Sequence, residues 1–269
     1  MTVPHAAASF RPGLSMLGWA LNEQANIPDY VRRAGEFLAS VSDDYELILI
    51  DDGSRDRTWA AALELQRTRP WLTVLKNDRN RGPGYCYRRA ISAASKDYFM
   101  AQTVDWAYDI DAFRPLLGEL QRYDVLQGVR PGEYSLTALG RRSDSLYKGI
   151  VSLTNYALIR VLFRLPFGDF QNVTVCPTRL AHALELECEG SFTNPEVMIK
   201  LYWGGASFLQ VPVAFHKRSR GTGTGTSRRA IAKSIGEIFA SWFRWVVRRG
   251  YDRRAPGAVA SVPAPERDQ

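Results

Sequence analysis

Residues 46–54 read ELILIDDGS, an apolar run that stops abruptly at two adjacent carboxylates and a turn. An apolar run of this length followed by Gly-Ser is typical of a strand that is buried on both faces of a sheet. Asp51 and Asp52 are therefore expected at the carboxyl end of that strand, which is where open α/β sheets bind ligands. Acids and serines that follow a strand also cap helices, so the motif alone leaves a purely structural role open.

Strand and helix patterns alternate on both sides of this run, from residue 14 to residue 130. Strands are expected at 14–21, 46–50, 72–75, 98–103 and 125–129, and helices at 26–41, 56–66, 82–95 and 111–121. Strands that alternate with helices at this spacing indicate right-handed βαβ units. We therefore predict an α/β fold with a mostly parallel sheet that is flanked by helices.

Beyond residue 130 the pattern changes to longer helices and fewer strands. Helices are expected at 143–163, 178–189, 195–203 and 227–249, with one strand at 207–214. We divide the chain into one domain over 14–227, made of the halves 14–130 and 131–227, and a basic amphipathic helix over 228–254. Residues 1–13 and 255–269 are predicted to be disordered, because the tail is rich in Ala, Pro and charge.

The composition is that of a folded protein in a reducing compartment. The 269 residues are 45% hydrophobic, which is enough for a substantial core. Cys86, Cys176 and Cys188 are too few and too scattered for a disulfide framework or a zinc site, so we expect buried thiols. No segment reaches the roughly 18 apolar residues of a membrane span, and residues 1–13 lack the apolar centre of a signal peptide. We therefore expect a cytoplasmic location.

The net charge of +7 comes from one segment near the carboxyl end. Between His216 and Arg254, eleven Lys and Arg residues stand against Glu237 and Asp252, and the rest of the chain is slightly acidic. We therefore expect this segment to face an anionic partner.

The helix predicted within this basic segment is amphipathic. Its apolar side chains fall within about 100° at 100° per residue, and they are Ile231, Ile235, Ile238, Phe239, Trp242, Trp245 and Val246. Aromatic side chains beside Lys and Arg indicate a helix that lies on anionic lipid, and the helix at 143–163 could lie there too. The alternatives are packing on the sheet, against a second copy of the chain, or against a membrane protein. A nucleic-acid partner is disfavoured, because the charge lies on an aromatic helix.

Four polar clusters follow the predicted strands or begin the helices beside them. They are WALNE at 19–23, DDGS at 51–54, NRGPG at 80–84 and TVD at 103–105. Each has an ordinary structural explanation when it is taken alone, such as a helix cap, a loop or a surface acid. Because all four fall at one edge of the sheet, we expect them to line a single crevice.

The set of clusters, in this order and spacing, resembles the family 2 glycosyltransferases of the GT-A fold over about residues 14–227. The motif LPFGDF at 165–170 resembles a step of the polyprenyl-phosphate sugar transferases, the dolichol-phosphate mannosyltransferase type. The motif VPVAFHKR at 211–218, with Gly221, resembles another motif of that subgroup. The resemblance implies an inverting transfer of a sugar from a nucleotide-diphosphate sugar to a polyprenyl phosphate, with 14–130 binding the donor and 131–227 the acceptor.

The resemblance also implies roles for individual residues. It places the donor against Ala20, Asn22, Glu23, Asp51, Asp52, Ser54, Gly82, Gly84 and Val104. Carboxylates suit the hydrogen-bond donors of base and ribose, so the chemistry of the acids agrees with this assignment. Asp105 is expected to bind Mg²⁺ or Mn²⁺, which bridges the diphosphate. The sequence departs from the family at Thr103, where an acid is expected, at Ala107, where Gln is frequent, and at Trp19, where Pro is usual.

Basic residues in the second half are expected to face phosphate groups. In the subgroup, the positions of Arg130, Arg141, Arg142 and Arg218 face phosphates of the donor or acceptor, and Arg forks bind phosphate bidentately. A phosphate acceptor is already ionised and needs no general base. A hydroxyl acceptor on a sugar, glycolipid or natural product would need one, and Asp169 is then the candidate.

The sequence therefore leaves three functions open. They are transfer to polyprenyl phosphate by a peripheral protein at the inner face of the membrane, transfer to a hydroxyl, and nucleotide binding without catalysis. The Thr103 substitution keeps the third function open.

Overall fold

The computed structural model describes residues 10–130, 146–170, 173–216, 228–248 and 256–263. These residues form an eight-stranded sheet in the order β3-β2-β1-β4-β6-β5-β7-β8. The strands are β1 (Leu14–Ala20), β2 (Tyr45–Asp51), β3 (Leu72–Lys76), β4 (Tyr98–Ala101), β5 (Val125–Val129), β6 (Thr174–Pro177), β7 (Phe208–Pro212) and β8 (Val259–Ser261). All neighbouring strands are parallel except β6, which runs antiparallel to β4 and β5.

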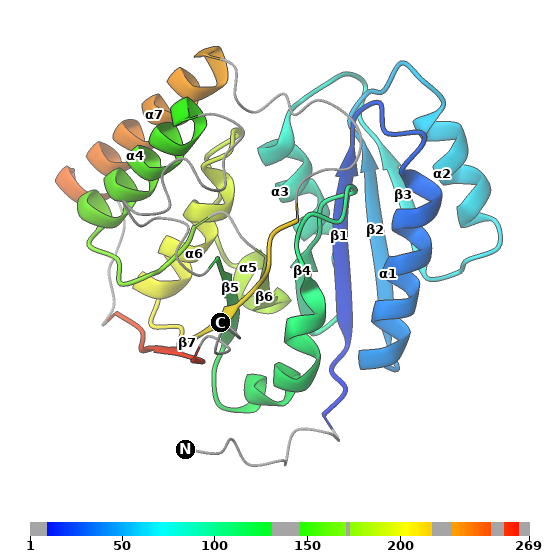
Figure 1. Cartoon of the computed structure of the whole chain (residues 1–269), viewed down its shortest axis with the longest axis horizontal. Helices are drawn as coiled ribbons and strands as arrows, with labels where there is room; N and C mark the ends of the chain where they lie inside the picture. Colours follow the sequence, from blue (N-terminus) through cyan, green and yellow to red (C-terminus); the bar gives the residue numbers. More distant parts are fainter. Residues whose placement is uncertain (1–9, 131–145, 171–172, 217–227, 249–255, 264–269) are drawn as a thin grey trace.

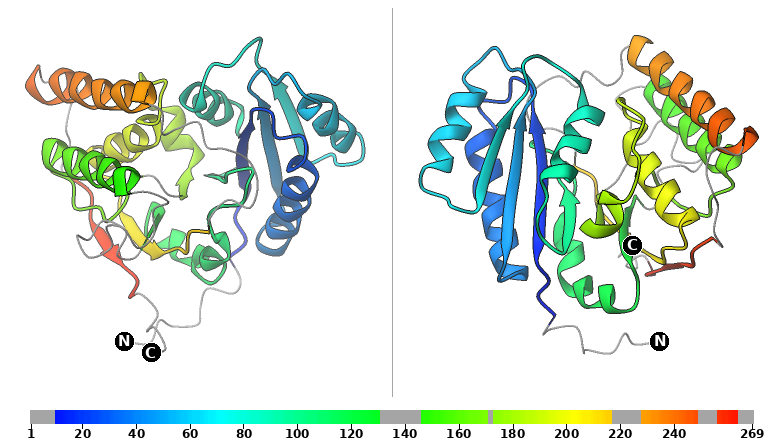
Figure 2. Two further views of the ribbon diagram at one scale, coloured as in Figure 1. Left: turned by 45° about the horizontal axis from the view of Figure 1, so that its top comes forward. Right: turned by 180° about the vertical axis from the view of Figure 1, so that it is seen from behind.

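Helices cover both faces of this sheet (Figure 1). One face carries α1 (Ile27–Val41), α2 (Thr58–Gln66) and the 3₁₀ helix η2 (Ile110–Gln121). The other face carries α3 (Pro83–Ala93), α5 (Thr178–His182) and α6 (Thr193–Trp203). Outside this second layer, α4 (Leu146–Phe163) and α7 (Arg228–Trp242) lie side by side, and the π-helical turn η5 (Phe243–Val247) continues α7 (Figure 2).

Strand β2 is buried on both faces, as its continuous apolar pattern predicts. Residues 47–50 are at most 1% exposed. Leu47 and Leu49 contribute to the core beneath α1, whereas Ile48 and Ile50 contribute to the core beneath α3. Because side chains alternate across a strand, an unbroken apolar run serves both layers at once.

The strand order reverses its direction at β1 and β4. Strands β2 and β3 extend the sheet on one side of β1, and the chain then returns to form β4 on the other side. The carboxyl ends of β1 and β4 therefore flank a topological switch point, which is the expected position of a ligand crevice.

Two strands were absent from the prediction. Strand β6 has only four residues, too few for a pattern to emerge, and its antiparallel pairing depends on β4 and β5 being in place. Strand β8 lies in the tail that was predicted to be disordered. It pairs with the free edge of β7, and Gly257 passes so close to the Ala206 carbonyl that an added Cβ would lie 1.7 Å from its oxygen. The disorder prediction was therefore wrong for residues 256–263, because edge pairing satisfies their backbone groups.

Other boundaries moved for local reasons. Residues 10–13, also predicted to be disordered, are held where Arg11 pairs with Asp43 at 2.8 Å. The helix expected at 178–189 ends at His182, and the helix expected at 111–121 is a 3₁₀ helix with Pro115 inside it. Proline has no N–H to donate, so it interrupts an ordinary α-helical ladder.

The amphipathic face of α7 points into the protein. Ile238 and Trp245 are at most 1% exposed, and Trp245 packs against Phe163 of α4 and Phe192 with ring centroids 5.9 and 6.2 Å apart. The prediction that this face lies on lipid was therefore wrong for Ile238 and Trp245, since the alternative of packing on the protein applies to them. No helix in the described ranges is both long and apolar enough to cross a membrane. All three cysteines are free and buried, as expected.

Candidate active site

Two loops at the crevice are joined by hydrogen bonds between the first two polar clusters. The Asn22 N–H donates to Ser54 Oγ at 2.9 Å, and the Arg55 N–H donates to Asn22 Oδ1 at 2.9 Å. The Glu23 N–H donates to Thr58 Oγ1 at 2.8 Å. Asn22 has a left-handed backbone with φ of 56°, which Asn tolerates better than most residues. Asn22 and Ser54 thus connect the loops after β1 and β2.

One carboxylate oxygen of Asp51 accepts no hydrogen bond from the described residues. Asp51 is 1% exposed, and its Oδ1 accepts a hydrogen bond from the Ser54 N–H at 3.2 Å. Its Oδ2 is buried and accepts no hydrogen bond from any residue that the structure describes. A buried acceptor without a donor is unfavourable, so this oxygen suits an N–H or O–H of a ligand.

Asp52 is engaged differently, because both of its oxygens bind the loop before α3. Oδ1 accepts from Asn77 Nδ2 at 2.7 Å and from the Arg81 N–H at 2.8 Å, while Oδ2 accepts from the Gly82 N–H at 2.9 Å. Asp52 therefore anchors the third cluster to the second. Its predicted contact with the donor stays a prediction, and the structure adds this role in holding the loop.

Gly53 and Gly84 are required by close approach. Gly53 has φ of 72°, and a Cβ there would lie 2.4 Å from the Arg79 carbonyl carbon. Gly84 would place a Cβ 2.3 Å from Thr193 Oγ1 and from the Glu189 carbonyl carbon. The start of α3 thus touches the segment before α6, which brings the two halves of the domain together at the crevice.

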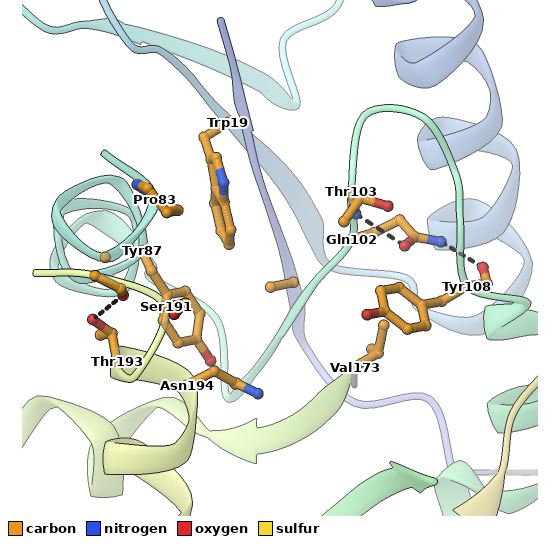
Figure 3. Close-up of a pocket in the computed structure, with 13 residues that line it drawn as sticks. Trp19, Pro83, Tyr87, Gln102, Thr103, Tyr108, Val173, Ser191, Thr193 and Asn194 are labelled. Atoms are coloured by element: carbon orange, nitrogen blue, oxygen red, sulfur yellow. Dashed lines mark hydrogen bonds between the residues drawn. The ribbon is translucent and has the colours of Figure 1, made fainter. Parts of the chain in front are cut away.

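A cavity of about 190 Å³ lies where these halves meet (Figure 3). Trp19 and Pro83 border it on one side, with Thr103 and Tyr108 across from them. The residues that line it are Trp19, Pro83, Gly84, Tyr87, Ala101, Gln102, Thr103, Tyr108, Val173, Gly190, Ser191, Thr193 and Asn194. Pro83 directly follows Gly82, so the cavity shares a wall with the loop that Asp52 holds. It lies at the carboxyl ends of β1 and β4, as the fold predicts for a ligand site.

The loop that carries Asp105 is held tightly. Gln102 bridges it, since its Oε1 accepts from the Thr103 N–H at 2.9 Å and its Nε2 donates to the Tyr108 carbonyl at 2.8 Å. The Ala107 N–H donates to Thr103 Oγ1 at 3.1 Å. Thr103, which replaces the expected acid, therefore stabilises the turn. The side chain of Val104 packs in the core, so only its backbone is available to a donor.

The residues after β7 reach the same loop. The His216 N–H donates to the Ala107 carbonyl at 2.8 Å, and Tyr108 pairs with Phe215. Sequence reasoning did not single out His216. It stands inside the VPVAFHKR motif, and its contact here is made by the backbone N–H.

The described residues contain no group of three or more His, Cys, Asp or Glu side chains that could hold a metal ion. A full protein cage is therefore absent from this part of the chain. Asp105 fits the mode in which Mg²⁺ binds one or two carboxylates and completes its shell with phosphate oxygens and water. The residues present thus suit a cation that arrives with a diphosphate.

Arg130 and Asp169 form a buried ion pair beside the cavity. Arg130 Nε lies 2.7 Å from Asp169 Oδ2, and the guanidinium also donates to Oδ1 at 3.1 Å. The Phe170 N–H donates to Asp169 Oδ1 at 2.7 Å. Asn194, which lines the cavity, donates to the Phe170 carbonyl at 2.9 Å. The two residues were predicted separately, as a phosphate ligand and as a general base, and the structure joins them.

The remaining basic residues of the prediction cannot be placed in this site. Arg141, Arg142 and Arg218 lie outside the described residues. Their contacts with phosphate stay predictions.

Apolar side chains are exposed on the outer pair of helices. On α4, Ile150 and Val161 are 49% and 71% exposed, and they lie on one face because eleven residues are close to three turns. On α7 and η5, exposure is 45% for Phe239, 46% for Phe243 and 48% for Val247. Arg248 stacks over Phe243 at 5.1 Å from the ring centroid. We call these five residues the outer apolar surface.

Comparison with known proteins identifies the family of this chain. The family described as "Glycosyl transferase family 2" matches residues 20–178. A dolichol-phosphate mannosyltransferase of Pyrococcus furiosus is 25% identical over 205 residues, and the match spans 74% of this chain and 55% of that protein. The chain thus spans little more than half the length of this curated relative.

Two solved structures show the same fold. The mannosyltransferase PcManGT from Pyrobaculum calidifontis, in complex with GDP-Man and Mn²⁺, has a TM-score of 0.61 at 17% identity, covering 94% of this chain and 69% of its own. Glucosyl-3-phosphoglycerate synthase from Mycobacterium tuberculosis, in complex with Mn²⁺, UDP and phosphoglyceric acid, has a TM-score of 0.58 at 19% identity. The match covers 87% of this chain and 81% of that one. The GT-A fold predicted from the motifs is thereby confirmed.

Proposed function

The chain belongs to glycosyl transferase family 2, and we propose that it transfers one sugar from a nucleotide-diphosphate sugar to a polyprenyl phosphate at the inner face of a membrane. That it is a glycosyltransferase follows from the family. The donor, the acceptor and the membrane are the proposal. The observation that carries it is the outer apolar surface on α4, α7 and η5.

The outer apolar surface suits an acceptor that is embedded in lipid. Five large apolar side chains are 45–71% exposed on two helices that lie side by side. The exposed cations Arg160, Lys233 and Arg248 lie on the same helices. Apolar groups that reach the acyl boundary beside cations that face anionic headgroups are the features of an interfacial helix. Phe239 belongs both to this surface and to the predicted lipid face, whereas Ile238 and Trp245 of that face pack into the protein.

The donor end of the crevice suits a nucleotide-diphosphate sugar. Asp51 Oδ2 and the Glu23 carboxylate are acceptors for base or ribose donors. Asp105 would hold Mg²⁺ or Mn²⁺ together with the diphosphate. When bound, the cation supplies electrostatic stabilisation of the charge that develops on the leaving diphosphate.

The ion pair between Arg130 and Asp169 agrees with a phosphate acceptor. Asp169 is 0% exposed, and its oxygens already accept from the Arg130 guanidinium and the Phe170 N–H. A carboxylate held in this way is a poor general base, because proton uptake would break the pair. A phosphate acceptor is ionised at neutral pH and attacks the anomeric carbon without a base.

A transfer assay tests this proposal. The protein is incubated with Mn²⁺, a panel of UDP- and GDP-sugars, and one of three acceptors: a long polyprenyl phosphate in anionic vesicles, a short soluble prenyl phosphate, or a glycolipid with free hydroxyls. We expect product only with the phosphates. Product only with the hydroxyl acceptor, or nucleotide binding with no transfer, would contradict the proposal.

A double variant isolates the contribution of membrane binding. Phe239→Ser with Phe243→Ser removes two exposed rings that are not part of the crevice. We expect transfer to the vesicle-borne acceptor to fall about tenfold or more, while transfer to the short soluble acceptor stays unchanged. Equal rates of the variant and the parent on vesicles would show that this surface does not bind lipid.

A further inference from the structure

The cavity beside the Asp52 loop has aromatic walls and no charged side chain. Among its described lining residues there is no Lys, Arg, His, Asp or Glu. Trp19 and Tyr87 pack together on one wall with ring centroids 5.6 Å apart. Tyr108 lies across from them, and its ring is turned toward the cavity (Figure 3). Aromatic faces are well suited to the C–H face of a sugar ring, which is apolar although its edge is polar.

Tyr87 brings a polar group to this aromatic wall. The residue is 3% exposed, and no described residue forms a hydrogen bond with its hydroxyl. Burial raises the pKa of this phenol well above its ordinary value, so the hydroxyl stays protonated and can donate. Figure 3 shows the hydroxyl directed toward the Asn194 side of the cavity. A buried Tyr hydroxyl usually has a partner, and here a ligand can supply it.

The other polar side chains of the lining are largely committed to the protein. Gln102 uses both ends of its amide within the Asp105 loop. The Thr193 hydroxyl bonds the Cys188 carbonyl at 3.0 Å. The Tyr87 hydroxyl is thus a group of the described lining that a ligand can bind.

The size of the cavity limits what can enter. Its volume of about 190 Å³ is below the roughly 300–1,000 Å³ of sites for drug-sized ligands. One monosaccharide unit suits this space. The cavity adjoins the loop held by Asp52, so a diphosphate bound along that loop would direct its sugar inward.

We propose that this cavity is the sugar subsite of the donor, in which Trp19 stacks on the ring of a neutral hexose and the Tyr87 hydroxyl binds one of its hydroxyls. This inference rests on the proposed function, since it needs a nucleotide-sugar donor. It also sets the substrate class. A uronic acid would bury a carboxylate that finds no cationic side chain among the described lining residues, which is strongly unfavourable, so neutral sugars are selected.

Calorimetric titration in the presence of Mn²⁺ tests the subsite. The ligands are UDP, UDP-glucose, UDP-glucuronate, GDP and GDP-mannose. For the parent protein we expect at least one neutral nucleotide-sugar to bind more tightly than its nucleoside diphosphate, and UDP-glucuronate to gain nothing over UDP. For Tyr87→Phe we expect the affinity for the neutral nucleotide-sugar to fall about 3- to 10-fold, with the diphosphate affinity unchanged.

Two further variants complete the experiment. Trp19→Phe keeps an aromatic ring of smaller area and is expected to weaken the binding of the neutral nucleotide-sugar without weakening that of the diphosphate. Tyr98→Phe is the control, since it removes a hydroxyl at the opposite end of β4 and should leave both affinities unchanged. Tight binding of UDP-glucuronate, or an equal loss of sugar and diphosphate affinity in Tyr87→Phe, would overturn the subsite but leave the proposed function intact. A parent protein that binds none of the five ligands would overturn both.

Discussion

Arg130 and Asp169 are 39 positions apart in the chain, yet Arg130 Nε lies 2.7 Å from Asp169 Oδ2. The side chains are 10% and 0% exposed. Because Phe170 connects to the cavity through Asn194, this pair orients one wall of the crevice. The pair connects the end of β5 to the LPFGDF motif, and the catalytic roles of its two members stay predictions.

Breaking this pair should destabilise the protein and inactivate it. We expect Asp169→Asn to lower the free energy of unfolding by about 3–5 kcal/mol, because the buried Arg130 guanidinium loses its charge interaction with the Asp169 carboxylate. The loss is measured by urea denaturation. The control is Asp44→Asn, which removes a partner of Lys96 on the surface and should cost under about 1 kcal/mol.

The same variant separates a positioning role from general-base catalysis. If Asp169 only positions Arg130 and the crevice wall, turnover with the phosphate acceptors should fall, and any turnover that the parent shows with a hydroxyl acceptor should fall by the same factor. A loss confined to hydroxyl acceptors would restore Asp169 as a general base.

The two acids after β2 should behave differently when they are changed. Asp51→Asn removes charge from a buried oxygen that accepts no hydrogen bond from a described residue, so the stability of the protein should be unchanged or slightly higher. The affinity for the nucleotide-sugar should fall about tenfold. Asp52→Asn turns an N–H₂ toward the amides of Arg81 or Gly82, so stability should fall by about 1–3 kcal/mol. Thermal unfolding with and without nucleoside diphosphate measures both effects. Equal stability losses in the two variants would contradict this division.

Gly84 should tolerate no side chain. Gly84→Ala places a Cβ 2.3 Å from backbone of the facing segment, so we expect a loss of about 1–3 kcal/mol of stability and weaker donor binding. Gly236 in α7 is the matched control, since nothing lies within 4 Å of its added Cβ. Gly236→Ala should stabilise the protein by about 0.5–1 kcal/mol through helix propensity. Chemical denaturation of both variants would show opposite signs.

The buried thiols should make the protein sensitive to alkali. Burial and the neighbouring Glu196 raise the pKa of Cys188 to about 12, and burial also raises the pKa of Cys86 and Cys176. The folded state therefore keeps protons that the unfolded chain loses near pH 8.5. Stability should be full below that pH and fall as the pH rises toward 12. The check is denaturation between pH 7 and 11, and a thiol reagent that labelled all three cysteines rapidly in the native protein at pH 8 would contradict it.

Several features could be predicted because they depend on residues close together in the chain. The run at 46–50 is unbroken and apolar, which is sufficient to indicate a buried strand, and β2 is buried on both faces. The polar residues after β1, β2 and β4 could be placed together, because the carboxyl ends of parallel strands lie at one edge of a sheet. The last helix was placed correctly, but its apolar face could pack on lipid or on protein, and the pattern is the same in both cases. Its burial depends on Phe163 and Phe192, which come from other segments.

The sequence by itself determined the α/β architecture, the family and the edge of the sheet where the crevice lies, because local periodicity and short motifs encode these. Only the tertiary structure decided that Asp52 holds a loop while Asp51 keeps an open oxygen, and that Arg130 pairs with Asp169. It also decided that Trp19, Tyr87 and Tyr108 enclose one cavity. These relationships join segments that are far apart in the chain, and their contacts exist only once β1, α3, β4 and α6 have packed together.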